Sequence, residues 1–454
     1  MKKTMILAGF LAGASLHAAV IQQVIVRQQW PWSTDVKVEY KLAEVTSPVD
    51  ISVRAFNGET ELPLPASAIT GDLYGISESG IGQFIIDPVK AFGNQKVAIA
   101  DFRVELELSD SAANINEVIY RVYCLTNTTY RDITKKEILN GEFGTYETDY
   151  SKFGSGFTTP WSDVVVWTAV TNDLKYMTTH LVMRKIPATN QVWQIGGYRG
   201  FDQHWVKLTE EYFIGVFPVT VEQDRLMNGG GASASPLTEA DALPKGQMNI
   251  VYTRGTRAPS SDSEYSMANH EAVFWPTNSY VHDVCAAFVL GKMRNRFHID
   301  FDLPSDAQWE VACRAGTVGD VLYNGKELSQ ANSEELGWVT SNSGSTFHRV
   351  GLKAPNPFGL YDLYGNALEV LPCLPAVDQP DKGGAADNPK IDPLSAVTTK
   401  DDVNVKRGGS AFMSYDYANS SARNQWYSWG QDDSNTAKIG YRVVIPAGKT
   451  TWNQ

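Results

Sequence analysis

The most reactive side chains in this sequence are four cysteines and seven histidines, and their spacing argues against the common catalytic and metal sites. Cys124, Cys285, Cys313 and Cys373 form no C-x-x-C pair and have no histidine at zinc-finger spacing. The sequence also lacks G-x-S-x-G, H-E-x-x-H and Walker motifs. These patterns therefore give no sign of a serine hydrolase, a zinc protease or a nucleotide-binding loop.

A group of residues with binding potential lies near the C-terminus, between residues 411 and 438. The segment mixes Ser, Asn, Gln and Asp with one methionine and six aromatic residues, namely Phe412, Met413, Tyr415, Tyr417, Trp426, Tyr427 and Trp429. Rigid amphipathic rings among adaptable hydrogen-bonding side chains are typical of recognition surfaces such as antibody loops. We predict a ligand-binding surface here. The alternative is that the rings fill the core of a loop-rich domain.

The composition is that of a globular protein with an acidic balance. Of the 454 residues, 43% are hydrophobic and 20% are charged, which excludes disordered and fibrous classes. Thirty-nine Lys and Arg residues face 51 Asp and Glu residues, for a formal net charge of -12. Because such a chain repels phosphate backbones, we do not expect nucleic acid as a partner.

Residues 1–19 have the features of a bacterial secretory signal peptide. Lys2 and Lys3 precede an apolar run that is too short to span a bilayer, and small residues follow at Ala18 and Ala19. No later stretch approaches eighteen consecutive apolar residues. We therefore expect a secreted, periplasmic or cell-surface protein without a membrane span.

Residues 20–109 read as strands separated by turn residues, with charged side chains alternating at Lys37, Glu39 and Lys41. This pattern predicts an antiparallel β-sandwich domain. We see no cluster of His, Cys or carboxylates in it, which favours a spacer or docking role. Residues 110–185 contain few clear elements and are interpreted as a connecting segment.

Helix signals appear from residue 186 onward. Thr220 with Gln223 and Ser305 with Gln308 are capping-box pairs, each of which predicts a helix start. Apolar residues recur with helical spacing over residues 281–289 and predict a further helix there. The predicted fold class is therefore α+β and loop-rich, with the β-sandwich first.

Two of the cysteines fall on the apolar sides of these predicted helices. We expect Cys285 and Cys313 to be buried thiols, because an apolar environment raises the pKa of a thiol and suppresses its reactivity. A disulfide between the two is the main alternative, and a reactive thiol is a further one.

Five segments in the second half of the chain resemble, in order, the signatures of the formylglycine-generating enzyme family, also called the sulfatase-modifying factor domain. These segments are residues 212–220 (YFIGVFPVT), 302–317 (DLPSDAQWEVACRAGT), 355–370 (PNPFGLYDLYGNALEV), 406–410 (KRGGS) and 439–445 (IGYRVVI). The resemblance covers residues 186–447. It implies a loop-rich variant of the C-type lectin fold for this domain, although a fold does not by itself fix an activity.

The resemblance also shows which catalytic residues are missing. Enzymes of the family bind Cu(I) through a cysteine pair after the Arg-Gly-Gly-Ser turn and oxidise a sulfatase cysteine to formylglycine; two soft thiolates suit this ion. Here Met413 and Ala418 stand near those positions, and no cysteine follows Cys373. A second branch, the sulfoxide synthases, needs a histidine triad, and no H-x-x-x-H-x-E pattern occurs. We therefore expect no copper cofactor and assign no catalytic residue.

A calcium site is the one metal site that the resemblance implies. Its ligands would be the side chains of Asp362 and Glu369 and the backbone carbonyls of Gly365 and Ala367. Hard oxygen ligands on a tight glycine-containing loop suit calcium. The family usually has tryptophan on both sides of the glutamate, where this sequence has Leu and Val, so local packing must differ.

These observations predict a secreted two-domain protein that binds a ligand through its C-terminal segment without catalysis. The ligand would be a protein, a peptide or a glycan. In relatives that serve as diversified display proteins, the stretch between Gly-Gly-Ser and the terminal Gly-Phe-Arg is the ligand surface. The alternative is a formylglycine-generating or sulfatase-maturation enzyme, or an accessory protein with a sulfatase as partner, that uses unrecognised chemistry.

Overall fold

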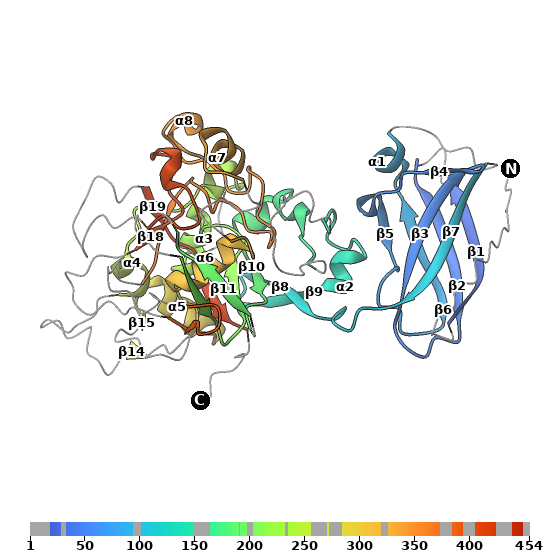
Figure 1. Cartoon of the computed structure of the whole chain (residues 1–454), viewed down its shortest axis with the longest axis horizontal. Helices are drawn as coiled ribbons and strands as arrows, with labels where there is room; N and C mark the ends of the chain where they lie inside the picture. Colours follow the sequence, from blue (N-terminus) through green and yellow to red (C-terminus); the bar gives the residue numbers. More distant parts are fainter. Residues whose placement is uncertain are drawn as a thin grey trace, which may run out of the picture. The chain divides into compact units, whose positions relative to one another are not determined.

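The chain folds into two compact units, which Figure 1 shows in the computed structural model. The first unit comprises residues 1–119, 133–147 and 167–170, and the second comprises residues 120–132, 148–166 and 171–454. The structure describes residues 19–28, 33–93, 101–148, 164–189, 191–197, 203–231, 235–255, 270–271, 284–318, 326–372, 384–393, 405–423 and 438–447.

The first unit is the predicted antiparallel β-sandwich. One sheet has the order β1 (Val20–Gln28), β2 (Val36–Ala43), β6 (Gly80–Ile86) and β5 (Ile69–Gly71). The other has the order β4 (Thr60–Leu62), β3 (Val49–Asn57) and β7 (Phe102–Asp110). Helix α1 (Pro88–Phe92) follows β6, and the Asp87 side chain accepts hydrogen bonds from its first-turn amides.

Alternation of side chains explains how the sandwich closes. In β2, Val36 and Val38 are buried while Lys37 and Glu39 face away from the core. Inward residues of both sheets, among them Val38 of β2 and Ile51 of β3, belong to one hydrophobic cluster. The period-two pattern in the sequence therefore identified the core face of β2 correctly.

The predicted connecting segment contains regular structure and contributes to both units. It includes β8 (Val118–Cys124), β9 (Tyr130–Thr134), α2 (Lys135–Leu139) and β10 (His180–Ile186). Strands β8, β9 and β10 join β13 (Tyr212–Gly215) and β20 (Val444–Pro446) in a five-stranded sheet of order β20-β13-β10-β8-β9. Pairing between β13 and β20 brings together two segments that are more than 200 residues apart in the sequence.

Short sheets and helices surround this sheet in the second unit. One sheet has the order β11 (Val192–Ile195), β12 (His204–Lys207) and β17 (Lys390–Ile391). Another has the order β18 (Lys406–Arg407), β16 (Leu368–Val370) and β19 (Ile439–Gly440). In a further sheet, β14 (His270–Glu271) pairs with β15 (Val284–Cys285). The helices are α3 (Val221–Met227), α4 (Ile250–Arg254), α5 (Val289–Phe297), α6 (Asp306–Arg314), α7 (Gln330–Leu336) and α8 (Thr340–Ser343), with a 3₁₀ turn η9 (Tyr415–Tyr417). The architecture is α+β and loop-rich, as predicted.

Both predicted capping boxes start helices. The Thr220 hydroxyl accepts from the Gln223 amide at the start of α3, and the Ser305 hydroxyl accepts from the Gln308 amide at the start of α6. In each case the glutamine side chain accepts from the cap residue's own amide in return. These local signals were sufficient to place both helix starts.

The prediction of a helix over residues 281–289 was wrong. Val284 and Cys285 form β15, which pairs with β14, and α5 begins only at Val289. Residue 281 lies outside the described part of the chain. A short apolar run is compatible with a buried strand as well as with a buried helix, so periodicity could not separate the two.

Cys285 and Cys313 are free and buried, and burial raises the pKa of Cys313 to about 12.

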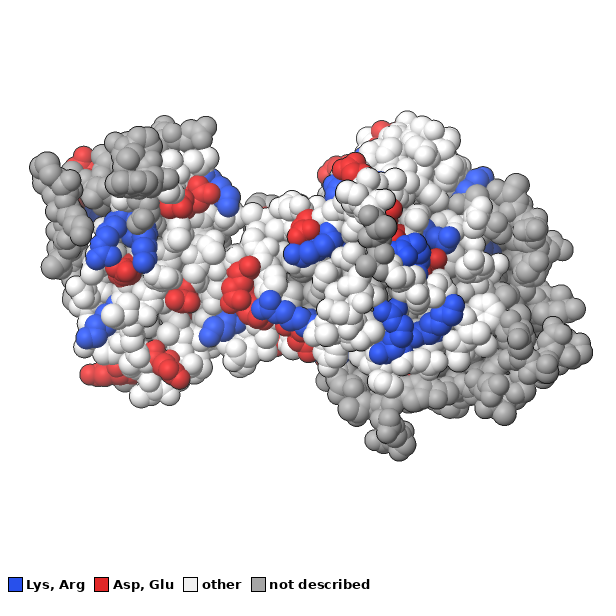
Figure 2. Space-filling view, turned by 180° about the vertical axis from the view of Figure 1, so that it is seen from behind, with Lys and Arg blue, Asp and Glu red and all other residues white. Residues whose placement is uncertain are grey.

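Among the described residues, no helix combines the length and the apolar character needed to cross a membrane. On the face in Figure 2, acidic and basic side chains alternate on the first unit, while basic side chains form groups on the second.

Candidate functional site

The floor of the candidate site is a cluster of buried charges beneath the segment 405–423. The cluster consists of Asp306, Glu310 and Arg314 of α6, Arg407 of β18, and Arg423, and we call it the arginine–carboxylate cluster. Each of these residues is no more than 7% exposed. Charges are rarely buried so completely unless they are paired, which indicates that each must have a specific partner.

Arg407 is the centre of this cluster. Its Nε donates to Asp306 Oδ1 at 2.5 Å, and its Nη2 donates to Glu310 Oε2 at 2.7 Å. Its Nη1 donates to the Ser420 carbonyl at 3.0 Å. One guanidinium therefore joins α6 to the chain that follows the Gly408–Gly409 turn.

The other two arginines extend the connection. Arg314 Nε donates to Glu310 Oε1 at 2.8 Å, and Arg423 Nε donates to Asp306 Oδ2 at 2.7 Å. Arg314 also donates to the Gly196 carbonyl at 2.6 Å. Both ends of the segment 405–423 are thus tied to α6 by charge-assisted hydrogen bonds, which are the stronger kind.

The arginines also set the protonation of the two carboxylates. Burial acts to raise the pKa of Asp306 and of Glu310, but Arg407 and the neighbouring arginines outweigh it and hold both pKa values below their ordinary range. Both carboxylates are therefore ionised at neutral pH. Both carboxylates therefore pair with arginines, and these ion pairs hold the segment 405–423 on α6.

A second buried ion pair lies beside the predicted calcium site. Arg442 Nη2 donates to Glu369 Oε1 at 2.7 Å, and Trp309 Nε1 donates to Glu369 Oε2 at 2.6 Å. The same guanidinium donates to the carbonyls of Gly215 and Tyr361. Glu369 therefore serves as the counter-ion of Arg442 in this structure.

Two of the four predicted calcium ligands, the carboxylates of Asp362 and Glu369, are already hydrogen-bonded by protein donors in this structure. Asp362 accepts from the Gly351 amide at 2.7 Å and from Asn366 Nδ2 at 3.1 Å, so that its two oxygens and those of Glu369 are all hydrogen-bonded. Burial raises the pKa of Asp362 to about 6. Ala367 is buried on the same turn, and the Gly365 amide donates to the Gly408 carbonyl. Calcium binding stays a prediction that requires Glu369 to separate from Arg442.

Copper(I) does not fit the residues near the family's cysteine positions either. Met413 is half-buried and offers one thioether, while Ala418 is fully buried and offers no ligand. Among the described residues, no group of three or more His, Cys, Asp or Glu is placed to hold a metal ion. The arrangement supplies no soft ligand pair for Cu(I).

The predicted ligand residues divide between the described and the undescribed parts of the chain. Phe412, Met413, Tyr415 and Tyr417 are half-buried. Trp426, Tyr427 and Trp429 lie outside the described residues. The four described side chains are neither core residues nor fully exposed, which is the state expected for a contact surface.

Main-chain hydrogen bonds hold this part of the segment. The Ala411 amide donates to the Asn366 carbonyl at 2.9 Å, and the Thr340 amide donates to the Met413 carbonyl at 2.9 Å. Turn η9, which carries both tyrosines, packs against α7. The backbone under the rings is therefore fixed from two sides, by the glycine turn and by α7 and α8.

The structure adds aromatic residues that the sequence reasoning missed. Phe347 meets Phe412 edge-on with ring centroids 5.3 Å apart, and His348 stacks on Trp338 at 3.8 Å. Lys353 Nζ lies 4.1 Å from the Trp338 ring centroid. We define the aromatic surface as this set of half-buried residues: Trp338, Phe347, His348, Phe412, Met413, Tyr415 and Tyr417.

One buried donor on this surface is unsatisfied. Trp338 Nε1 is buried and has no hydrogen-bond partner among the described residues, which is an unusual state for a polar group. The His348 ring, by contrast, hydrogen-bonds the Ser343 carbonyl at 2.9 Å through Nε2. No local sequence pattern indicates this grouping, since Trp338 lies more than seventy positions before the tyrosines.

Comparison with known protein families gives a match within the second unit. Residues 182–447 match the family model described as sulfatase-modifying factor enzyme 1-like domain. A comparison with curated proteins gives no match.

Similar solved structures include Treponema denticola variable protein 1, which is 23% identical over 59% of this chain and 95% of its own, with a TM-score of 0.42. They also include PvdO from Pseudomonas aeruginosa, which is 20% identical over 59% of this chain and 94% of its own, with a TM-score of 0.38. CarF is 15% identical over 56% of this chain and 98% of its own, with a TM-score of 0.28.

Proposed function

The chain belongs to the family of sulfatase-modifying factor enzyme 1-like domains, and from this premise we propose that it is a secreted, non-catalytic binding protein whose ligand docks on the aromatic surface. The observation that carries the proposal is the combination of half-buried rings with a backbone fixed by buried charges. Loops on a rigid scaffold commonly carry recognition residues. A preorganised loop also loses less entropy when it binds.

The chemistry of the surface supports a protein or peptide ligand with acidic and apolar groups. Phe412 and Tyr415 offer apolar ring area, and such rings are frequent binding hot spots. Lys353 beside Trp338 and Lys438, whose Nζ lies 5.7 Å from the Phe412 ring centroid, add positive charge at the rings. An acidic peptide satisfies both features better than a neutral glycan does.

The non-catalytic part of the proposal rests on the ligands that the chain offers for copper. Met413 and Ala418 stand near the positions of the family's cysteine pair, and Cys313 is a buried thiol with a pKa of about 12. A protonated, enclosed thiol cannot act as a soft thiolate ligand. Secretion rests on the signal-like residues 1–19.

Peptide selection tests this proposal. A phage library of random dodecapeptides is panned on the purified full chain, and selected peptides are measured against Tyr415→Ala and Phe412→Ala. We expect acidic peptides with apolar residues, and at least about tenfold weaker binding by each variant.

Tyr252→Ala is the matched control, because Tyr252 is an exposed tyrosine on α4 outside the aromatic surface. Its affinities should equal those of the unmodified chain. Selected peptides that bind all four proteins equally, or no enrichment over a blocked surface, would contradict the proposal.

A further inference from the structure

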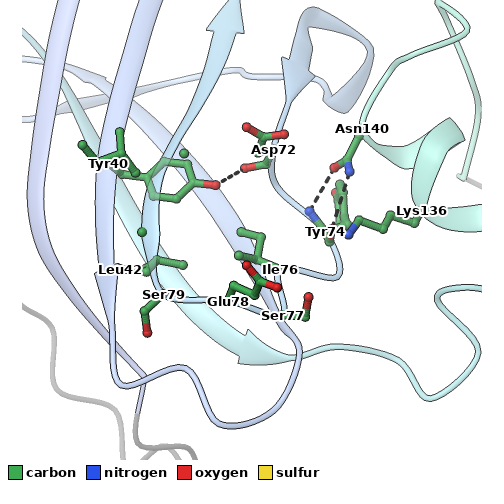
Figure 3. Close-up of a pocket in the computed structure, with 13 residues that line it drawn as sticks. Tyr40, Leu42, Asp72, Tyr74, Ile76, Ser77, Glu78, Ser79, Lys136 and Asn140 are labelled. Carbon is green, nitrogen blue, oxygen red and sulfur yellow. Dashed lines mark hydrogen bonds between the residues drawn. The ribbon is translucent and has the colours of Figure 1, made fainter.

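The first unit contains a pocket that the sequence reasoning did not anticipate. It has a volume of about 300 Å³ and opens at the end of the sandwich where β2 finishes and β6 begins (Figure 3). Its wall is completed by the loop 72–79 and by two side chains of the 133–147 segment, Lys136 and Asn140. The pocket lies wholly within the first unit and is independent of the aromatic surface.

The pocket exists because two inward positions of β6 are glycines. Opposite Val38 and Val36 of β2, β6 places Phe84 and Ile86, which fill the core; opposite Tyr40 and Leu42 it places Gly82 and Gly80. These are the positions where the core would otherwise continue to the end of the sheet. Glycine removes two inward side chains there.

The two glycines have different roles. A Cβ on Gly82 would lie 2.1 Å from Tyr40 Oη, so this glycine makes room for the Tyr40 ring. That hydroxyl donates to the Asp72 carbonyl at 2.5 Å (Figure 3). A Cβ on Gly80 would meet no atom within 4 Å, which means that open space lies at this position.

Hydrogen bonds fix the loop that forms the rim. Asn140 Oδ1 accepts from the amides of Leu73 and Tyr74, both at 3.0 Å, as Figure 3 shows for Tyr74. Lys136 Nζ donates to the Gly75 carbonyl at 2.7 Å, and Asp50 accepts from the Gly75 amide at 2.8 Å. The pocket is therefore preformed, as binding pockets for small molecules usually are.

At the far end of the rim, the loop is tied back to the sheet. The Ser79 hydroxyl accepts from the Val45 amide at 3.0 Å. Ser77 and Glu78, which precede it, are exposed side chains that also line the pocket. These two side chains can reorient toward a ligand without breaking the rim.

The lining determines which chemistry fits. Leu42 and Ile76 offer apolar side chains, and the exposed Glu78 offers a carboxylate acceptor, while the Asp72 carboxylate already accepts from the Gln83 amide. Lys136 is the single cation among the described lining residues, and its ammonium group already donates to Gly75. The pocket therefore favours a ligand rich in donors and disfavours an anion.

We propose that this pocket binds one neutral, hydroxyl-rich sugar residue, such as the terminal unit of a glycan. A sugar ring has hydroxyl donors around its edge and apolar C–H faces, which match the Glu78 carboxylate and the apolar side chains of Leu42 and Ile76. The volume lies at the lower end for ligand sites and suits a single ring better than a longer chain.

The experiment uses the full chain and a panel of free monosaccharides observed by saturation-transfer NMR. The panel contains common hexoses, pentoses, deoxyhexoses, N-acetylhexosamines and glucuronic acid, with n-butylamine as a probe for a basic side chain, each at about 10 mM because single-ring affinities are weak. We expect signals from at least one neutral sugar and none above background from glucuronic acid.

Variants connect the signal to the pocket. Glu78→Gln should weaken binding about tenfold, since a hydrogen bond to a charged group is lost, and Glu78→Lys should abolish it. Glu59→Lys is the matched control, because Glu59 is a fully exposed glutamate of the same unit that does not line the pocket. Tyr415→Ala should leave the sugar signal unchanged, which separates this proposal from the proposed function.

Several results would overturn the proposal. These are no signal from any neutral sugar, a stronger signal from glucuronic acid or n-butylamine, and equal loss of signal in Glu78→Lys and Glu59→Lys. The three glutamate variants change exposed side chains, and circular dichroism checks that every variant is folded.

Discussion

Arg407 and Glu310 form a fully buried ion pair with Nη2 and Oε2 2.7 Å apart, although 97 positions separate the two residues in the chain. The pair joins the glycine turn before the aromatic surface to the middle of α6. It therefore connects the stability of the domain to the shape of its candidate binding site. This relationship leads to the first two predictions.

Breaking the pair from either side should destabilise the second unit. We expect Glu310→Gln or Arg407→Met to lower its free energy of unfolding by about 3–5 kcal/mol, because each leaves a buried charge without its partner. The double variant should lose less free energy of unfolding than the sum of the losses in the two single variants. Urea unfolding followed by tryptophan fluorescence measures this. Lys175→Ala, which removes an exposed ion pair with Asp173, should cost less than about 1 kcal/mol.

Acid should weaken the same connection. The pKa values of Asp306 and Glu310 lie below the ordinary 3.8 and 4.5 in the folded state, so the unfolded chain binds protons first as the pH falls. Their stabilisation is complete above about pH 5 and is lost as the pH decreases through the folded-state values. Urea unfolding measured between about pH 7 and pH 3 should show a smaller decrease in the free energy of unfolding for Glu310→Gln than for the unmodified chain. Parallel curves for the two proteins would contradict the assignment.

Calcium binding and ion pairing make different predictions for Glu369. The pair with Arg442 predicts that Glu369→Gln lowers the melting temperature equally with EDTA and with calcium, since a buried arginine loses its counter-ion. A calcium site predicts instead that the unmodified chain melts higher with calcium and that the variant loses this shift. We expect the first result. A calcium-dependent shift that Glu369→Gln removes would establish the predicted site.

Measurements of unfolding free energy should distinguish residues of the aromatic surface from core residues. Tyr415→Ala or Tyr417→Ala should change the free energy of unfolding by much less than the about 3–5 kcal/mol typical of a buried ring. Tyr364→Ala is the reference, because Tyr364 is a fully buried tyrosine of the same unit. Equal losses for Tyr364 and Tyr415 in urea unfolding would mean that Tyr415 is a structural residue.

Copper chemistry gives a direct test of the alternative function. We expect no stoichiometric Cu(I) after desalting and no oxygen-dependent mass change of a sulfatase-type cysteine peptide, since Met413 and Ala418 stand near the family's cysteine positions and no cysteine follows Cys373. Mass spectrometry of the peptide and metal analysis of the protein measure both. Restoring two cysteines as Met413→Cys with Ala418→Cys is a positive control for copper uptake.

Local signals explain what the sequence predicted correctly. The capping boxes at Thr220 and Ser305 use hydrogen bonds between residues three positions apart, and the alternation in β2 depends on every second residue. Such patterns are complete within a short window. The ordered family motifs identified the domain from the sequence, because each motif is itself a short local pattern.

Other features depend on residues that are distant in the sequence. Nothing near Arg407 indicates that its partners lie on α6, and nothing near Tyr415 indicates Trp338. The strand at Val284 needs a partner strand to be recognised as one. A weak sequence pattern does indicate the pocket of the first unit. Gly80 and Gly82 interrupt the apolar alternation of β6 at two successive inward positions.

The way the segment 411–423 is attached affects how this protein can evolve. Three of its anchors engage main-chain atoms, namely the amide of Ala411, which every amino acid but proline provides, and the carbonyls of Met413 and Ser420. The Arg423 side chain adds a fourth anchor, on Asp306. Replacing Phe412 or Tyr415 therefore leaves these attachments in place. One inherited framework can therefore carry different side chains at these two positions while the architecture stays constant.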